Sequence, residues 1–87
     1  MSEKTDVITQ PVALTNAITK ATPEQVDTLW SILKYKEIGI YRKIKCMSSV
    51  LGLNFDKVVT DLPKDETGRI LDHKTRHLIH DILIQNS

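Results

Sequence analysis

A capping sequence followed by apolar residues at helical spacing constrains the fold of this chain more than any other feature. Thr22 can cap a helix, Pro23 suits the first helical position, and Gln25 can reach back to complete a capping box. Apolar residues then recur at i, i+3, i+4 and i+7, within an arc of about 100° around a helix. They are Val26, Leu29, Trp30 and Leu33. The pattern predicts a helix with one buried stripe.

A second long helix is predicted after Gly39, where glycine favours a break. Its apolar residues lie within an arc of about 60°. Gly52 is well placed as the C-terminal cap, with Leu53 folding back onto the helix. The stripe consists of Ile40, Ile44, Met47 and Leu51.

Three shorter signals complete an all-α pattern. Pro11 precedes a first helix, Asn54 can cap a short helix that Pro63 ends, and Asp72 can cap the last one. Residues 64–68 are typical of a solvated turn, and a strand at residues 69–71 would have no evident pairing partner. We therefore expect a compact bundle of four to five short helices. The apolar positions of these three helices are Leu14, Ala17 and Ile18; Phe55, Val58, Val59 and Leu62; and Thr75, Leu78, Ile79, Ile82 and Leu83.

The domain organisation follows from length and polarity. Residues 1–10 are polar and lack helical periodicity, which predicts a flexible N-terminal tail, and residues 11–87 suffice for a single helical domain. The polar start of the chain does not resemble a signal peptide, and the uncharged residues 7–19 are too few to span a bilayer. We expect a cytoplasmic protein without direct membrane insertion, in which a homodimer is possible.

Catalytic and metal-binding patterns are weak. His73, His77 and His80 share one face of the last helix, but Lys74 stands where a helical zinc-protease motif has glutamate, and that face should be solvated. Cys46 is expected to be a small apolar filler beside the buried stripe. We expect no catalytic residue, no metal, no cofactor and no small-molecule substrate, and hence not an enzyme.

Residues 47–58 are typical of a helix-turn-helix-like unit, because apolar residues flank Gly52 and Val58 lies six positions beyond it. The second helix would present polar side chains that carry more negative than positive charge, which opposes binding to DNA phosphates. Two interpretations stay open. The pattern indicates either close packing of two helices alone or a small helix-turn-helix DNA-binding transcriptional regulator. The set is Asn54, Asp56, Lys57, Thr60 and Asp61.

The net charge is +1, yet residues 34–45 hold five Lys or Arg and one Glu. Arg42 and Lys45 fall opposite the apolar stripe and should be exposed, with tyrosines near the rim. Tyrosine and arginine are enriched in protein interfaces. The block is either a solvated face or a docking surface for an acidic partner segment. The candidate partner-binding residues are Tyr35, Lys36, Tyr41, Arg42 and Lys45.

Residues 21–26 (ATPEQV) and 34–45 (KYKEIGIYRKIK), in a chain under 90 residues, resemble the lysis-inhibition accessory proteins of T-even bacteriophages. The resemblance covers about the middle third to half of the chain and contains no short diagnostic motif. It implies a regulator in the host bacterial cytoplasm that binds the cytoplasmic N-terminal segment of a phage holin and delays lysis. It supplies no catalytic residues.

Overall fold

The computed structural model describes residues 11–86, so the predicted N-terminal tail lies outside the described residues. Within that range the chain contains no strand, and residues 69–71 contribute only an isolated antiparallel bridge between Lys64 and Ile70. The all-α prediction is confirmed. The helices are α1 (Val12–Lys20), α2 (Pro23–Lys34), α3 (Ile40–Leu51), α4 (Phe55–Thr60) and α5 (Asp72–Gln85).

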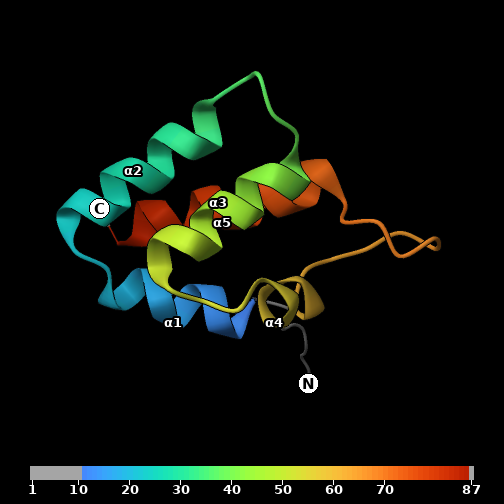
Figure 1. Cartoon of the computed structure of the whole chain (residues 1–87), viewed down its shortest axis with the longest axis horizontal. Coiled ribbons are helices and arrows are strands. Elements are labelled where there is room, and N and C mark those ends of the chain that lie inside the picture. Colours follow the sequence, from blue (N-terminus) through green and yellow to red (C-terminus); the bar gives the residue numbers. More distant parts are fainter. Residues whose placement is uncertain (1–10, 87) are drawn as a thin grey trace.

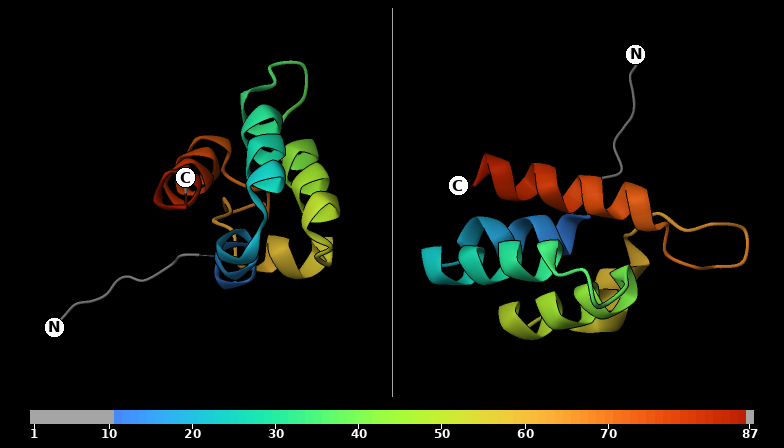
Figure 2. Two further views of the ribbon diagram at one scale, coloured as in Figure 1. Left: turned by 90° about the vertical axis from the view of Figure 1, so that its left-hand side faces the viewer. Right: turned by 90° about the horizontal axis from the view of Figure 1, so that it is seen from above.

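Helix α3 contacts each of the other four helices, and its most extensive packing is against α2 (Figure 1). Both views of Figure 2 place α2 between α5 on one side and α3 on the other. Helices α1 and α4 lie along the edge opposite α2, and the connection between α4 and α5 projects from the bundle (Figure 1). Within residues 11–86, no helix combines the length and apolar character needed to cross a bilayer.

The start of α2 follows the local sequence. The Thr22 hydroxyl accepts a bond from the Gln25 backbone N–H at 3.1 Å, and the Gln25 side chain accepts one from the Thr22 N–H at 2.9 Å. This is the predicted capping box, which satisfies two N–H groups that the helix cannot pair internally. Gln25 also donates through Nε2 to the Val50 carbonyl at 3.2 Å, which ties α2 to the end of α3.

The connection between α3 and α4 also forms as predicted. Gly52 adopts a left-handed conformation (φ 69°), which glycine accommodates without steric cost. The Leu53 N–H then donates to the Ser48 carbonyl at 2.8 Å, and Asn54 caps α4 by accepting from the Lys57 N–H at 3.2 Å. The helix-turn-helix-like geometry is therefore present.

One hydrophobic core joins all five helices. Of the two predicted stripes, Trp30 in α2 and Leu51 in α3 are only half-buried, because they lie at the margin of the core. The remaining stripe residues are buried, as the periodicity predicts. The buried apolar residues are Leu14, Ile18, Val26, Leu29, Leu33, Ile40, Ile44, Met47, Val58, Leu62, Ile79, Ile82 and Leu83.

Two local predictions are wrong. Asp72 does not cap α5: the cap position is Leu71, and the Asp72 carboxylate pairs one turn later with Arg76 at 2.7 Å. Cys46 is exposed rather than an apolar filler. It lies about 100° around α3 from Met47, beyond the arc that the neighbouring helices cover.

Candidate functional site

The five predicted partner-binding residues are all exposed, but the structure divides them. Tyr35 and Lys36 lie in the connection between α2 and α3, whereas Tyr41, Arg42 and Lys45 project from the outer face of α3. Tyr35 and Tyr41 keep 52% and 54% of their surface exposed. Exposed aromatic and basic side chains of this kind suit an interface.

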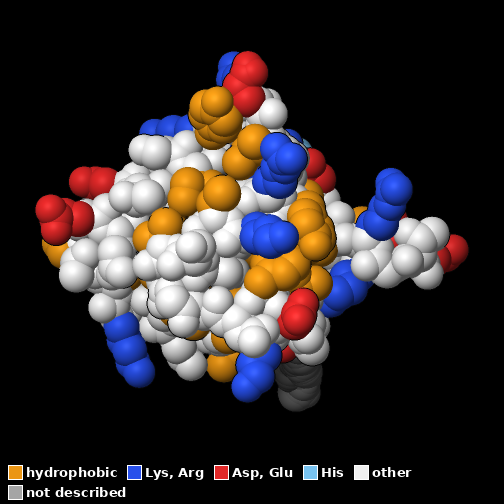
Figure 3. Space-filling model, viewed as in Figure 1, with side chains coloured by type: hydrophobic (Ala, Val, Ile, Leu, Met, Phe, Trp, Pro, Cys, Tyr) orange, Lys and Arg blue, Asp and Glu red, His pale blue; other side chains and the backbone are white. Residues whose placement is uncertain are grey.

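Phe55 of α4 brings two of the predicted residues together. Its ring meets that of Tyr41 edge-on at a centroid distance of 5.0 Å, and the Lys45 ammonium lies 5.8 Å from its centroid. We call Tyr41, Arg42, Lys45 and Phe55 the α3–α4 surface. Figure 3 shows Lys or Arg side chains standing among hydrophobic ones over this part of the molecule. The sequence assigned Phe55 only to the apolar face of α4, and its half-buried position depends on how α4 packs against α3.

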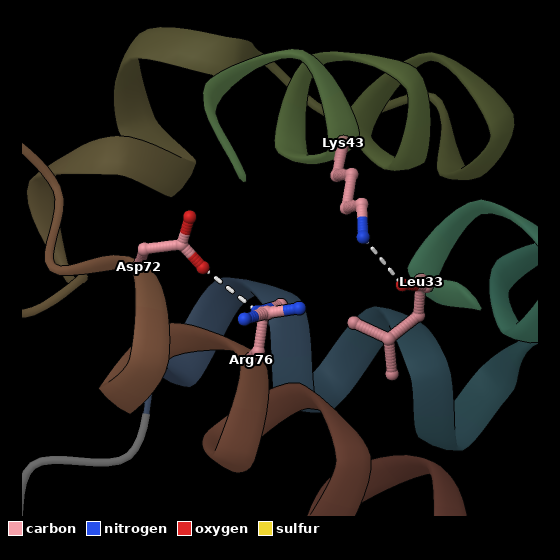
Figure 4. A network of polar contacts seen from close by, with 4 residues as sticks. All are labelled: Leu33, Lys43, Asp72 and Arg76. Carbon is pink, nitrogen blue, oxygen red and sulfur yellow. Dashed lines mark hydrogen bonds and ion pairs between the residues drawn. The ribbon is translucent and has the colours of Figure 1, made fainter. Parts of the chain in front are cut away.

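Lys43, from the same basic block, points inward. It is only 4% exposed, and its Nζ donates a 2.6 Å hydrogen bond to the carbonyl oxygen of Leu33 at the end of α2 (Figure 4). Burial lowers the pKa of the Lys43 amine below its ordinary 10.5; the nearby Arg76 lowers it further, and Asp72 opposes the shift. A buried amine responds in this way because desolvation disfavours its charged form.

The three histidines are exposed, as the sequence predicts, and they lie along one side of α5. The rings of His73 and His77 are 4.8 Å apart, while His80 meets Trp30 of α2 edge-on at 5.3 Å. In the part of the chain that the structure describes, His, Cys, Asp and Glu side chains form no group of three suited to hold a metal ion. The histidines instead line a groove between α2 and α5.

Within residues 54–61, the second helix of the helix-turn-helix-like unit exposes one cation, Lys57. Helix α4 has six residues and exposes Asp56, and Asp61 follows it, also exposed. Among the cations in and beside the unit, Arg42, Lys45 and Lys57 are exposed, whereas Lys43 is buried against Leu33. DNA binding stays a prediction that a titration with duplex DNA tests.

No protein family, curated protein or solved structure matches the chain.

Proposed function

We propose that this chain is a non-catalytic regulator that binds the cytoplasmic N-terminal segment of a phage holin and thereby delays host lysis. The resemblance of residues 21–26 and 34–45 to the lysis-inhibition accessory proteins supports the identity of the partner. The proposal places the protein in the host cytoplasm, where that segment is accessible.

The observation that supports a docking surface on α3 and α4 is the packing of Tyr41 and Lys45 on Phe55. These contacts favour the observed positions of the Tyr41 ring and the Lys45 ammonium at the surface, which reduces the side-chain entropy lost on binding. The exposed edge of Tyr41 can pack against an apolar side chain, and Arg42 and Lys45 can pair with carboxylates.

A delay of lysis requires only that the protein bind one state of the holin more tightly than the other. A regulator shifts the holin between its non-permeabilising and permeabilising states only by as much as it prefers one of them. Binding to the N-terminal segment delays lysis if that segment is more accessible in the non-permeabilising state. Retention of this state by a bound protein involves no chemical step.

Titration calorimetry of the full chain with the soluble N-terminal segment of the holin tests the proposal. We expect a saturable complex, at least tenfold weaker with Tyr41→Ala or Lys45→Gln, which corresponds to a loss of about 1.4 kcal/mol. Ile84→Ala is the matched control, because Ile84 is also 54% exposed but lies on α5. The same Tyr41 and Lys45 variants should shorten the lysis delay in infected cells.

Two results would contradict the proposal. One is the absence of a complex at micromolar concentrations with both components folded. The other is a complex that Tyr41→Ala and Ile84→Ala weaken equally, which would place the contact outside the α3–α4 surface.

A further inference from the structure

A groove between α2 and α5 forms a second surface that the α3–α4 surface does not include. It consists of two adjoining hollows with volumes of about 370 and 550 Å³, which share Leu33, Lys34 and Arg76. The first extends along α5 to His80, and the second extends toward Ile38 in the connection between α2 and α3. The hollow that reaches His80 is lined only by residues of α2 and α5, so it lies away from the outer face of α3.

The groove concentrates positive charge. Its lining includes the cations Lys34, Lys36, Lys43 and Arg76 and the single carboxylate Asp72. That carboxylate is already engaged, since an Asp72 oxygen lies 2.7 Å from Nε of Arg76. The whole chain has a net charge of only +1, so this excess is local. Such a surface attracts anions and repels cations.

Lys43 gives the groove a buried polar anchor. Lys43 is 4% exposed, and its bond to the Leu33 carbonyl uses one of the three N–H donors of the ammonium group. A buried cation is stabilised by a nearby anion, because a carboxylate compensates for the lost hydration. Figure 4 shows Lys43 and Arg76 directed into the same space from α3 and α5.

Apolar side chains lie beside these cations. The half-buried Trp30 ring packs against His80 and has the Lys34 ammonium 5.4 Å from its centroid. From Asp72 to His80 the groove follows α5 for about 12 Å, the length of roughly four residues of extended peptide. A small inorganic anion would fill only one hollow and would leave the Trp30 side unused. A peptide of alternating acidic and apolar residues would match both the cations and the apolar side chains that line the groove.

We propose that this groove binds a short acidic peptide segment of a partner protein. Carboxylates of the segment pair with Lys34, Lys43 and Arg76, and an apolar side chain packs on Trp30. The inference is independent of the proposed holin contact, because it uses different residues of the chain.

Trp30 is the only tryptophan in the chain, so its fluorescence reports directly on the groove. The probe is a hexapeptide of alternating glutamate and leucine with acetylated and amidated ends, titrated into the full chain. We expect a saturable fluorescence change, with at least tenfold weaker binding when glutamine replaces each glutamate. Equal binding of the glutamine peptide would overturn the proposal, as would an equal saturating change with inorganic phosphate alone.

Variants locate the contact. Lys34→Gln changes an exposed groove residue and should weaken the peptide complex at least fivefold, whereas Lys57→Gln, an exposed lysine on α4, should leave it unchanged. Tyr41→Ala should also leave it unchanged, which separates this groove from the proposed holin contact. Equal losses with Lys34→Gln and Lys57→Gln would show general charge attraction and would overturn the proposal.

Discussion

The ammonium group of Lys43 closes the C-terminus of α2 by donating a 2.6 Å hydrogen bond to the carbonyl oxygen of Leu33. Carbonyl groups in the last turn of a helix have no partner within the helix. The bond therefore joins the start of α3 to the end of α2 across the connection that contains Tyr35 and Lys36. It also holds a charged group inside the protein, which makes its contribution sensitive to pH.

Replacing Lys43 by methionine should lower the free energy of unfolding by about 1–3 kcal/mol near pH 7, because a buried carbonyl loses its donor. Folding lowers the pKa of Lys43, so between the folded value and 10.5 the unfolded chain binds more protons. The stability that Lys43 contributes therefore rises with pH through that interval. Urea denaturation should show a larger difference between wild type and Lys43→Met at about pH 10 than at pH 7.

The matched control for this pH dependence is Lys57→Met, which changes an exposed lysine on α4. Because Lys57 is exposed, its replacement should change the free energy of unfolding by no more than about 0.5 kcal/mol at either pH. A Lys43→Met difference that shrinks at alkaline pH would contradict the assigned environment of the amine.

Thr75→Val should stabilise the protein. Thr75 is completely buried on α5, and among residues 11–86 its hydroxyl oxygen has no hydrogen-bond partner. Because a buried polar group without a partner is unfavourable, we expect thermal denaturation to show a gain of about 1 kcal/mol. Thr28→Val is the control, because the exposed Thr28 hydroxyl donates to the Glu24 carbonyl at 3.0 Å and gains nothing from substitution. A loss of stability in Thr75→Val would contradict this prediction.

Thr22→Ala should cost about 1 kcal/mol, because α2 loses the hydroxyl that caps it. In a domain of this size the loss corresponds to a fall of roughly 4–8 °C in Tm. Thr28→Ala changes a threonine on the same helix that caps nothing, and its effect should stay within about 0.5 kcal/mol. Similar melting temperatures for the two variants would argue against the capping box.

The turn centred on Asp65 should keep the bonds to its carboxylate down to pH 3.8 and lose them only below it. The Asp65 carboxylate accepts bonds from the Thr67 hydroxyl at 2.7 Å, the Arg69 N–H at 3.0 Å and the Thr67 N–H at 2.8 Å. The bond from the Thr67 hydroxyl contributes most to lowering the pKa of Asp65 below its ordinary 3.8, and the two backbone N–H bonds add to the shift. The stability that these bonds give the folded state is fully present above pH 3.8. It is lost as the pH falls through the lower pKa that Asp65 has in the folded state. Amide chemical shifts of Thr67 and Arg69 should therefore titrate below pH 3.8.

Asp65→Ala gives the corresponding test by substitution. Amide exchange at Thr67 and Arg69 should become faster, while the helical circular dichroism stays unchanged, because the turn lies outside the helices. Unchanged exchange at both amides would show that the carboxylate does not hold the turn.

The Cys46 thiol should react with a disulfide reagent in the folded protein, because it is exposed on α3. We expect a native rate within about tenfold of the rate in denaturant. Reaction only after unfolding would restore the interpretation of Cys46 as a buried apolar filler.

Local sequence predicted the features that depend on a few neighbouring residues. The capping box of Thr22 and Gln25, the left-handed Gly52 and the Asn54 cap each depend on backbone groups within four positions. The apolar stripes were predictable because burial follows helical periodicity. The half-buried Trp30 was not, because the periodicity gives the centre of a stripe but not its covered width.

The remaining features depend on packing between distant segments. The buried Lys43 amine donates to the Leu33 carbonyl, which lies ten residues earlier in the chain and comes within reach only when α2 and α3 pack together. Asp72 had a suitable position for a cap but pairs with Arg76 instead. The groove also escaped prediction, since Lys34 and Arg76 belong to helices that are far apart in sequence and adjacent only in the fold.

The loop between α4 and α5 is closed at its base, where the Leu71 N–H donates to the Pro63 carbonyl at 2.9 Å. A second bond, from the Asp65 N–H to the Arg69 carbonyl at 2.8 Å, closes it again further out. The separation of the two helices is thus set below the tip of the loop, and extra residues at Thr67 would lengthen only the tip. An affinity tag or fluorescent label inserted there would lengthen a loop that already projects from the bundle (Figure 1).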